Sequence, residues 1–305
     1  MNLLPRCLSS PLGGCLPVPL GPVLGLLLAA SNARAQQQAA AVTFLPATVR
    51  TAGLAGAATA LVGDAGSVFV NASGLATIKH AGLEGMIGWL PNPTIHTSVA
   101  GAVRLGRLHL GGGYQFLDLP PGGALKNNSL WVGSLVYRFG MFALGGTGRY
   151  VTARDSSDVI QRSVAGDVSA TMAFFDIFAL AVGVQNIAPQ AVSGVGLALP
   201  TTTRLGIMLN LVDPQSRGRL LGTVDVIWTD GQERRTVVGG EAGLVFGGFG
   251  IMVRAGGGGQ PVATGQSRFA AGGSLVLHQV TIDYAWQEQT AYGRNVHRLG
   301  LRLTF

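Results

Sequence analysis

The sequence predicts a transmembrane antiparallel β-barrel of about fourteen strands, with an N-terminal segment folded into its lumen as a plug. Three observations predict this all-β fold class: low charge without a spanning apolar run, segments of alternating polarity, and connections that alternate between short and long. Charged residues make up 11% of the 305 residues, whereas a soluble domain carries roughly 25%. No run of about 18 apolar residues follows the first 40 positions. The remaining bilayer-spanning structure is a closed barrel, in which no backbone group is left unpaired in lipid.

Residues 1–35 are interpreted as a signal peptide that is removed from the mature chain. Arg6 provides a positive charge, residues 18–30 an apolar run, and Ala33-Arg34-Ala35 a small-residue cleavage site. A single membrane anchor is the alternative, but the apolar segment is short and is broken by Pro17, Pro19 and Pro22. The predicted regions are therefore the signal peptide (1–35), the plug (36–80) and the barrel (81–305).

The mature chain is expected to lack cysteine, because Cys7 and Cys15 both lie in the signal peptide. Disulfides and thiolate chemistry are then excluded. The signal peptide also carries two arginines and no acidic residue, so its removal lowers the formal net charge by two, from +7 to +5. Such a mild and dispersed positive charge does not indicate a nucleic-acid partner.

Alternating polarity runs through the chain from about residue 83 to the C-terminus. Fourteen segments of roughly ten to fourteen residues can be counted there, many with a period of two. In residues 296–305 the pattern is clearest: one face carries Leu299, Leu301, Leu303 and Phe305, and the other carries Arg298 and Arg302. A strand with one face in lipid and the other in a polar lumen requires this pattern.

The charged residues of these segments fall on one face. When the faces are assigned from the apolar residues, the charges lie on the inner face, because a charge in mid-bilayer lipid costs about 2–4 kcal/mol. Arg162, near a segment end, breaks the pattern. The inner charges are Arg104, Arg138, Asp167, Arg204, Asp225, Glu241, Arg254, Asp283, Arg298 and Arg302.

Two roles remain open for these inner charges. They could line a permeation path, or they could tie neighbouring strands and the plug together. Opposite charges on adjacent strands favour the second role: Glu241 is expected beside Arg254, and Asp283 beside Arg298 or Arg302.

The connections differ in length in a regular order. Even-numbered ones are short, around Gly106, Gly140, Asp176, Gly247 and His278, with residues 213–218 slightly longer. Odd-numbered ones are generally longer, at 119–127, 152–159, 188–201, 256–267 and 290–295, with 91–93 and 230–233 as shorter exceptions. Short turns on one rim and long loops on the other are typical of a bacterial outer-membrane barrel with its short turns in the periplasm. This distinguishes the chain from a soluble β-sandwich, whose strands alternate in a similar way.

Residues 36–80 do not alternate, and their Ala- and Gly-rich sequence predicts short helices and tight turns. Asp64 is expected to cap a turn, and Asn71 to make a side-chain turn bond before Gly74. Fourteen strands enclose more space than their own side chains fill, so this segment is expected to occupy the lumen. Inward glycines could make room for it, or they could reflect tolerance of small residues in a closed sheet; they are Gly206, Gly239 and Gly243.

The stretch from Arg50 to Ala76 resembles the N-terminal motif of the FadL and PorV/PorQ superfamily of outer-membrane barrels. The shared pattern is a Gly/Ala-rich run, an Asp-Ala-Gly/Ser element and, seven residues after the Asp, Asn-Pro-Ala-Gly-Leu-Ala. Here Ala72 and Ser73 replace the Pro and Ala, which weakens the turn. Phe305 is similar to the terminal signal that the barrel-assembly machinery reads. The hatch-motif residues are Gly53, Gly56, Asp64, Asn71 and Gly74.

The resemblance implies a fourteen-stranded barrel with an N-terminal hatch in the bacterial outer membrane. It implies one of two functions: transport of small hydrophobic compounds, which is the leading hypothesis, or a type IX secretion-associated module that binds protein cargo or translocon partners. Short loops and 7% aromatic residues fit poorly with high-affinity fatty-acid capture. The expected partners are outer-membrane lipid, the barrel-assembly machinery through the C-terminal strand, and a hydrophobic ligand or a secreted protein cargo.

No motif for catalysis, metal binding or a cofactor is found. The five histidines lack metal-ligand spacing with a nearby carboxylate. The glycine-rich run at 256–261 lacks the Lys-Ser/Thr of a phosphate loop, and no Gly-x-Ser-x-Gly elbow occurs. The sequence therefore predicts no enzyme, no catalytic residue, no metal and no cofactor.

Overall fold

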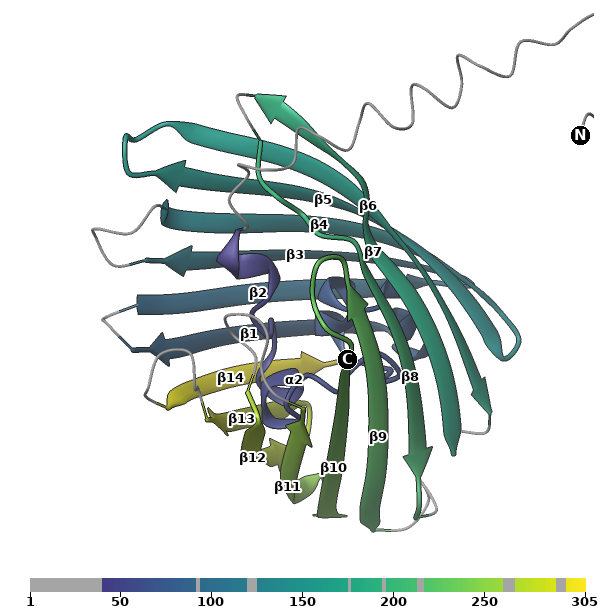
Figure 1. Ribbon diagram of the computed structural model, residues 1–305. Coiled ribbons are helices and arrows are strands. Elements are labelled where there is room, and N and C mark those ends of the chain that lie inside the picture. The colour runs from purple at the N-terminus through teal and green to yellow at the C-terminus, as the bar shows by residue number, and fades with distance from the viewer. Residues whose placement is uncertain are drawn as a thin grey trace, which may run out of the picture. The chain divides into compact units, whose positions relative to one another are not determined.

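Fourteen antiparallel strands among the described residues pair in chain order, and the last strand closes onto the first (Figure 1). The computed structural model describes residues 40–91, 94–119, 125–174, 177–193, 196–212, 217–259, 267–288 and 295–305. The predicted fold class is confirmed, while the predicted signal peptide lies outside these residues. The strands are β1 (Ala81–Leu90), β2 (Thr94–Leu105), β3 (Leu108–Asp118), β4 (Leu125–Phe139), β5 (Phe142–Asp155), β6 (Ile160–Phe174), β7 (Phe178–Ser193), β8 (Thr202–Asn210), β9 (Gly218–Thr229), β10 (Arg235–Phe246), β11 (Phe249–Gly258), β12 (Phe269–Leu277), β13 (Val280–Gln287) and β14 (Val296–Thr304).

The barrel closes between β1 and β14. Their antiparallel register runs from Gly82 opposite Thr304 to Trp89 opposite His297. The amide of Phe305 extends the seam by donating to the carbonyl of Ala81 over 2.9 Å. Closure leaves no sheet edge whose backbone groups would be unpaired in lipid.

The two faces of the wall differ in polarity as the alternation predicts. Outward side chains such as Leu135, Val168 and Ile251 are 54–66% exposed, which is the apolar surface of a membrane-spanning barrel. Most of the predicted inner charges are buried within the lumen. Two lie at the short-turn rim instead and are exposed: Arg104 and Arg138 donate through Nε to the carbonyls of Gly106 and Gly140.

The short turns and the longer loops alternate around the barrel as expected. Glycines with positive φ form the turns at Gly106, Gly140 and Gly247. Four predicted loops are too long, because strands extend into them: 119–127, 152–159, 188–201 and 256–267. The largest difference is at Ala188, which was expected to begin a loop, whereas β7 continues to Ser193. Bulges allow this, because Asn186 and Ala188 adopt φ values of 58° and 48°, which shifts the β6–β7 register.

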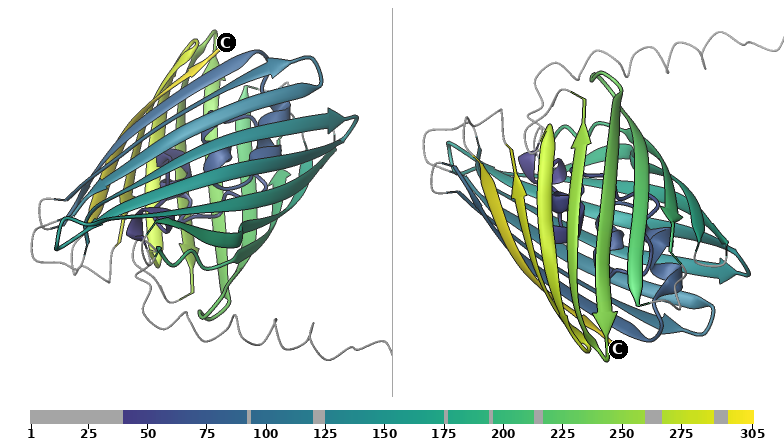
Figure 2. Two further views of the ribbon diagram at one scale, coloured as in Figure 1. Left: turned by 90° about the horizontal axis from the view of Figure 1, so that it is seen from above. Right: turned by 90° about the horizontal axis from the view of Figure 1, so that it is seen from below.

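The plug, described here as residues 40–80, lies inside the ring of strands in both views of Figure 2. Its helices are short, and Thr48 caps α2 by accepting from the amide of Thr51 over 3.0 Å. No helix among the described residues is long and apolar enough to cross a bilayer. The helices are η1 (Ala41–Thr43), α2 (Val49–Gly53), η2 (Ala65–Phe69) and η3 (Ala72–Thr77).

Wall glycines let the plug approach the sheet closely. A Cβ at Gly239 would lie 2.9 Å from the Leu54 side chain, and one at Gly206 would lie 2.7 Å from Thr59. These two glycines therefore make room for the plug as predicted. The prediction for Gly243 is wrong, because a Cβ there would meet the neighbouring strand β11 and not the plug.

A positive charge on the outer face should destabilise the barrel according to its depth. Val168 lies near the middle of β6 and Val103 near the short-turn end of β2, and both face outward. We expect Val168→Arg to cost about 2–4 kcal/mol and Val103→Arg about 0–1 kcal/mol. Reversible unfolding in lipid vesicles would measure both. Equal costs at the two positions would contradict a bilayer around this wall.

Candidate functional site

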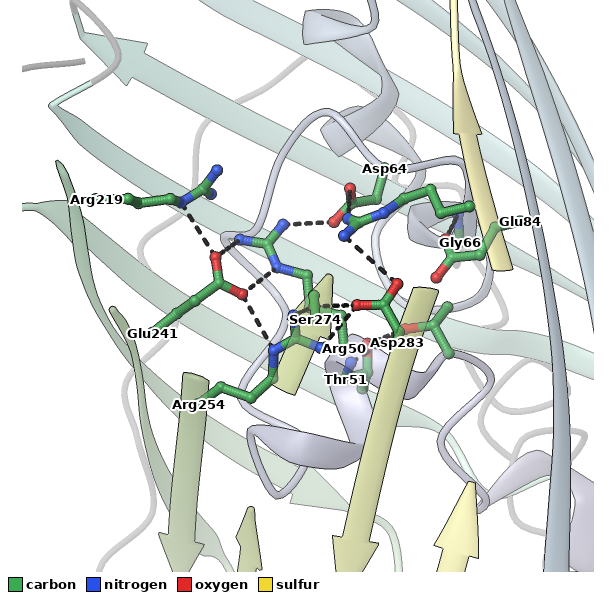
Figure 3. Close-up of polar contacts among 12 residues, drawn as sticks. Arg50, Thr51, Asp64, Gly66, Glu84, Arg219, Glu241, Arg254, Ser274 and Asp283 are labelled. Atoms are coloured by element: carbon green, nitrogen blue, oxygen red, sulfur yellow. Dashed lines mark hydrogen bonds and ion pairs between the residues drawn. The ribbon is translucent and has the colours of Figure 1, made fainter. Parts of the chain in front are cut away.

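The plug is fixed to the inner wall by a network of buried charges, drawn in Figure 3. Arg50 of α2 makes a two-pronged contact with Glu241 of β10, with Nε and Nη2 at 3.0 and 3.1 Å from the carboxylate oxygens. Its Nη1 lies 2.5 Å from Asp64, which follows α2 in the plug. Paired guanidinium and carboxylate planes are the strongest hydrogen-bonded ion pairs. Arg50 therefore joins the plug to the wall, and it also joins two segments of the plug to each other.

The network continues along the wall with alternating sign. Asp64 accepts from Arg302 of β14 over 2.6 Å, and Arg302 lies 3.5 Å from Asp283 of β13. Arg254 of β11 bridges Asp283 at 3.1 Å and Glu241 at 3.3 Å. Each buried charge therefore has a partner of opposite sign, which offsets the cost of burial. The charge network comprises Arg50, Asp64, Arg219, Glu241, Arg254, Asp283 and Arg302.

Two sequence predictions can be compared with this network. Glu241 pairs with Arg254 as expected, and Asp283 pairs with Arg302 and not with Arg298. The predicted cap at Asp64 is wrong: it precedes η2, but its side chain makes no capping bond. The reason is that its carboxylate is taken by two arginines. Burial alone would raise the pKa of Asp64, but the charges of Arg50 and Arg302 outweigh burial and hold the pKa below its ordinary value.

A second polar contact holds the middle of the plug. Asp225 of β9 is fully buried, and its Oδ2 accepts from the amides of Ala58 and Thr59 over 2.9 and 2.8 Å. The Thr59 hydroxyl donates to the same oxygen over 2.6 Å. The plug thereby satisfies one oxygen of this buried carboxylate, Oδ2, while Oδ1 has no hydrogen-bond partner among the described residues.

The hatch motif forms a turn that contacts β6. Asn71 accepts from the amide of Ser73 over 3.2 Å, as predicted, and donates to Thr171 over 3.0 Å. Gly74 lies against the Leu61 carbonyl, where a Cβ would approach to 2.7 Å. Gly53 likewise touches the Arg254 side chain, and Gly56 has a φ of 97°. The motif residues therefore shape the plug, and Asp64 and Asn71 also bind the wall.

A small polar cavity of about 80 Å³ remains between the plug and strands β3–β10. Arg149 lines it and is paired with Asp167 at 2.6 Å. Arg204 and Arg235 also line it, with Gln185 beside them. Because pockets for drug-sized molecules measure roughly 300–1,000 Å³, this cavity is no passage for a ligand in the present conformation.

The long-loop half of the lumen is apolar on the side of β1, β3, β4, β5 and β14. We call this surface the apolar vestibule. Plug residues 40–47 cover it, and two leucines of the β7–β8 loop, Leu197 and Leu199, join the same buried cluster. Inward leucines are unexpected in a water-filled pore, whose lumen is polar. The vestibule consists of Leu90, Leu117, Leu125, Leu130, Val151 and Val296.

Arg298 lies apart from the charge network. It is fully buried and donates through Nη1 to Gln287, while its Nε and Nη2 have no hydrogen-bond partner among the described residues. His96, also fully buried, lies 3.3 Å from Gln115 through its Nε2. Among the described residues, no group of three His, Cys, Asp or Glu side chains is placed to hold a metal ion.

Several residues of the site were not predicted. The alternation of the strands places Arg149, Arg219 and Glu84 on the inner face, as it does the predicted inner charges. Glu84 accepts there from the amide of Gly66 in the plug over 3.1 Å. Arg50 gave no signal of its own, because it lies in a non-alternating segment. Its partner on β10 is 191 residues away in sequence.

The fold and the plug together define a transmembrane barrel closed by its own N-terminal segment. No family model and no curated protein matches the sequence. Among solved structures, the fold is similar to the toluene transporter TbuX of Ralstonia pickettii (10% identity, TM-score 0.55, covering 87% of this chain and 99% of that one). It is also similar to the Pseudomonas putida toluene transporter TodX (8%, 0.54, 88% and 96%) and to a Pseudomonas aeruginosa FadL homologue (10%, 0.52, 88% and 99%). At these identities the likeness is one of fold.

Removing Arg50 should loosen the plug. In Arg50→Met, Glu241 and Asp64 each lose a buried partner, at a cost of about 3 kcal/mol. Hydrogen exchange of the plug amides should accelerate on the order of 100-fold. Lys126→Met is the matched control, because the Lys126–Asp158 pair is exposed and contributes about 0–1 kcal/mol. Equal exchange in the two variants would refute the anchoring role.

The contribution of Asp64 should depend on pH in one direction. Because its pKa is lowered in the folded protein, its contacts should stabilise the plug fully above pH of about 4 and lose this effect as pH falls further. Hydrogen exchange of residues 50–76, corrected for intrinsic rates, would show the loss. The Asp64→Asn variant should not show this acceleration of exchange at low pH. If the acceleration persists in the variant, it arises from another carboxylate and the prediction is wrong.

Proposed function

We propose that this protein is an outer-membrane channel for small hydrophobic compounds, closed at rest by its plug. The apolar vestibule carries the proposal. Apolar side chains that face a lumen gain little from water but offer a binding surface for an apolar solute. Removal of residues 40–47 from this surface would expose it to the long-loop rim.

The proposed location in the outer membrane is supported by the features of the barrel wall. An apolar outer face, inward charges and short turns on one rim are features of such barrels. We place the short turns in the periplasm, with the vestibule at the outer surface. Phe305, at the periplasmic end of β14, is proposed as the signal for the barrel-assembly machinery.

Passage requires the plug to move, because the polar cavity of about 80 Å³ cannot hold a hydrocarbon of useful size. We propose that the hatch segment Asp64–Ala76 shifts, since it separates the vestibule from the short-turn rim. Its apolar side chains Val68, Phe69 and Leu75 belong to the same buried cluster as the vestibule. An apolar solute could therefore replace their contacts.

The named structures of similar fold favour a channel over the alternative, a secretion or assembly module that binds protein cargo. Two of them are toluene transporters, and none of the three is described as an enzyme. Toluene is therefore a reasonable first probe.

A reversible tether would test whether the hatch moves. Ala65 of η2 lies against β1, and its Cβ would be 3.6 Å from a Cβ at Gly82, within the range of disulfides. The mature chain is expected to be free of cysteine, so Ala65→Cys with Gly82→Cys forms a single pair. Uptake of radiolabelled toluene by cells that produce only this variant should fall at least tenfold when oxidised and recover on reduction.

The two single-cysteine variants are controls and should transport in both redox states. Equal uptake by the oxidised and reduced double variant would show that the hatch stays fixed. Equal uptake by cells with and without the protein, for toluene and for larger apolar dyes, would overturn the channel itself. A secreted protein recovered in stoichiometric amount would favour the secretion module.

A further inference from the structure

The outer wall carries an apolar groove of about 880 Å³ at the short-turn ends of β9 to β12. It lies on the face opposite the lumen, because its side chains are the outward ones of their strands. Ile251, Val253 and Leu244 are 66%, 59% and 56% exposed. Six side chains form most of it: Leu220, Leu244, Phe246, Phe249, Ile251 and Val253.

Two glycines are among the residues that line the groove. Gly243 and Gly250 lie near each other across the β10–β11 hairpin, and a Cβ at either would meet the other strand's backbone at 2.6–2.8 Å. The two positions therefore contribute backbone alone to the groove, which is open to the surrounding membrane.

Positive charge is concentrated at one end of this groove. Arg217 lies with its Cζ 5.4 Å from the centre of the Phe246 ring, a cation–π contact. Arg219 also lines the groove, but it is an inward residue of β9, and its Nε lies 3.1 Å from Glu241 in the lumen. Arg217, which lies just before β9 on the short-turn rim, therefore supplies the charge that faces the groove.

We propose that this groove binds one anionic phospholipid of the periplasmic leaflet. An acyl chain would lie along Leu244 and Ile251, and the phosphate would lie at Arg217. The groove fits a lipid because its apolar wall is followed by a cationic end, just as the acyl chain of a phospholipid is followed by its anionic headgroup. The proposal rests on the membrane orientation given above and is independent of what the lumen carries.

Charge complementarity selects the anionic class. Arg217 forms no ion pair with an acidic residue among the described residues, and its planar cation can donate to phosphate in pairs. A zwitterionic lipid would bring its own ammonium to this end and gain less.

Native mass spectrometry of the full mature protein in mild detergent tests the proposal. After delipidation, the protein is titrated with phosphatidylglycerol and with phosphatidylethanolamine. We expect one retained phosphatidylglycerol and weaker retention of phosphatidylethanolamine. Arg217→Gln should weaken phosphatidylglycerol binding about 5-fold and leave phosphatidylethanolamine unchanged.

A second variant tests the groove itself by filling it with a larger side chain. Ile251→Trp should abolish retention of the lipid, whereas Leu135→Trp, at an equally outward position on β4 that is 54% exposed, should retain it. Equal retention by the two tryptophan variants, or equal affinity for the two lipids, would overturn the proposal. A dimer that is lost in Ile251→Trp would assign the groove to a second copy of the chain and would also overturn it.

Discussion

Lipid on the outer face dictates where the barrel keeps its charges. A charge that faces the bilayer costs several kcal/mol, so the strands turn their charged side chains inward. The lumen then holds Glu241, Arg254, Asp283 and Arg302 close together. These charges need partners, because water is excluded from most of this interior. The plug supplies two of the partners, Arg50 and Asp64.

The same constraint explains how an Ala- and Gly-rich segment can be ordered. The plug has few large apolar side chains and helices of three to six residues, which are not stable alone in water. Its order comes from the wall: Asp225 accepts three hydrogen bonds from Ala58 and Thr59. Small residues suit this position, since Gly206 and Gly239 bring the two backbones into contact. Plug and wall are therefore complementary in both charge and volume.

The sequence was sufficient to predict the strands of the wall and their inner face, but it was insufficient to predict how the plug contacts the wall. Many of the strand segments show a period of two, and the lipid constraint then assigns the inner face to residues such as Asp167 and Arg204. The error in the β7–β8 connection arose because bulges at Asn186 and Ala188 interrupt the period without ending the strand. Long-range pairing carries no local signal, so the contact of Arg50 with Glu241 was not predicted. Asp64 was assigned a capping role for the same reason, because its arginine partners lie outside its own turn.

The anchors of the plug are unequal, and this determines which part can move. Arg50 and Glu241 are 5% and 0% exposed at their side chains, and their contact is two-pronged. An apolar solute cannot replace such a contact, because it offers no charge to either partner.

The hatch segment is held more weakly. Asp64 and Arg302 are 16% and 11% exposed, so water reaches this pair. If the pair separates, Asp64 keeps Arg50 and Arg302 keeps Asp283, and neither charge is left alone. The rest of the segment is held by hydrogen bonds such as that from Asn71 to Thr171 and by the apolar side chains Val68, Phe69 and Leu75. A hydrocarbon can substitute the apolar contacts at about 25 cal/mol per Å². The distribution of charge within the plug therefore supports the proposal that it stays fixed at α2 and opens at η2 and η3.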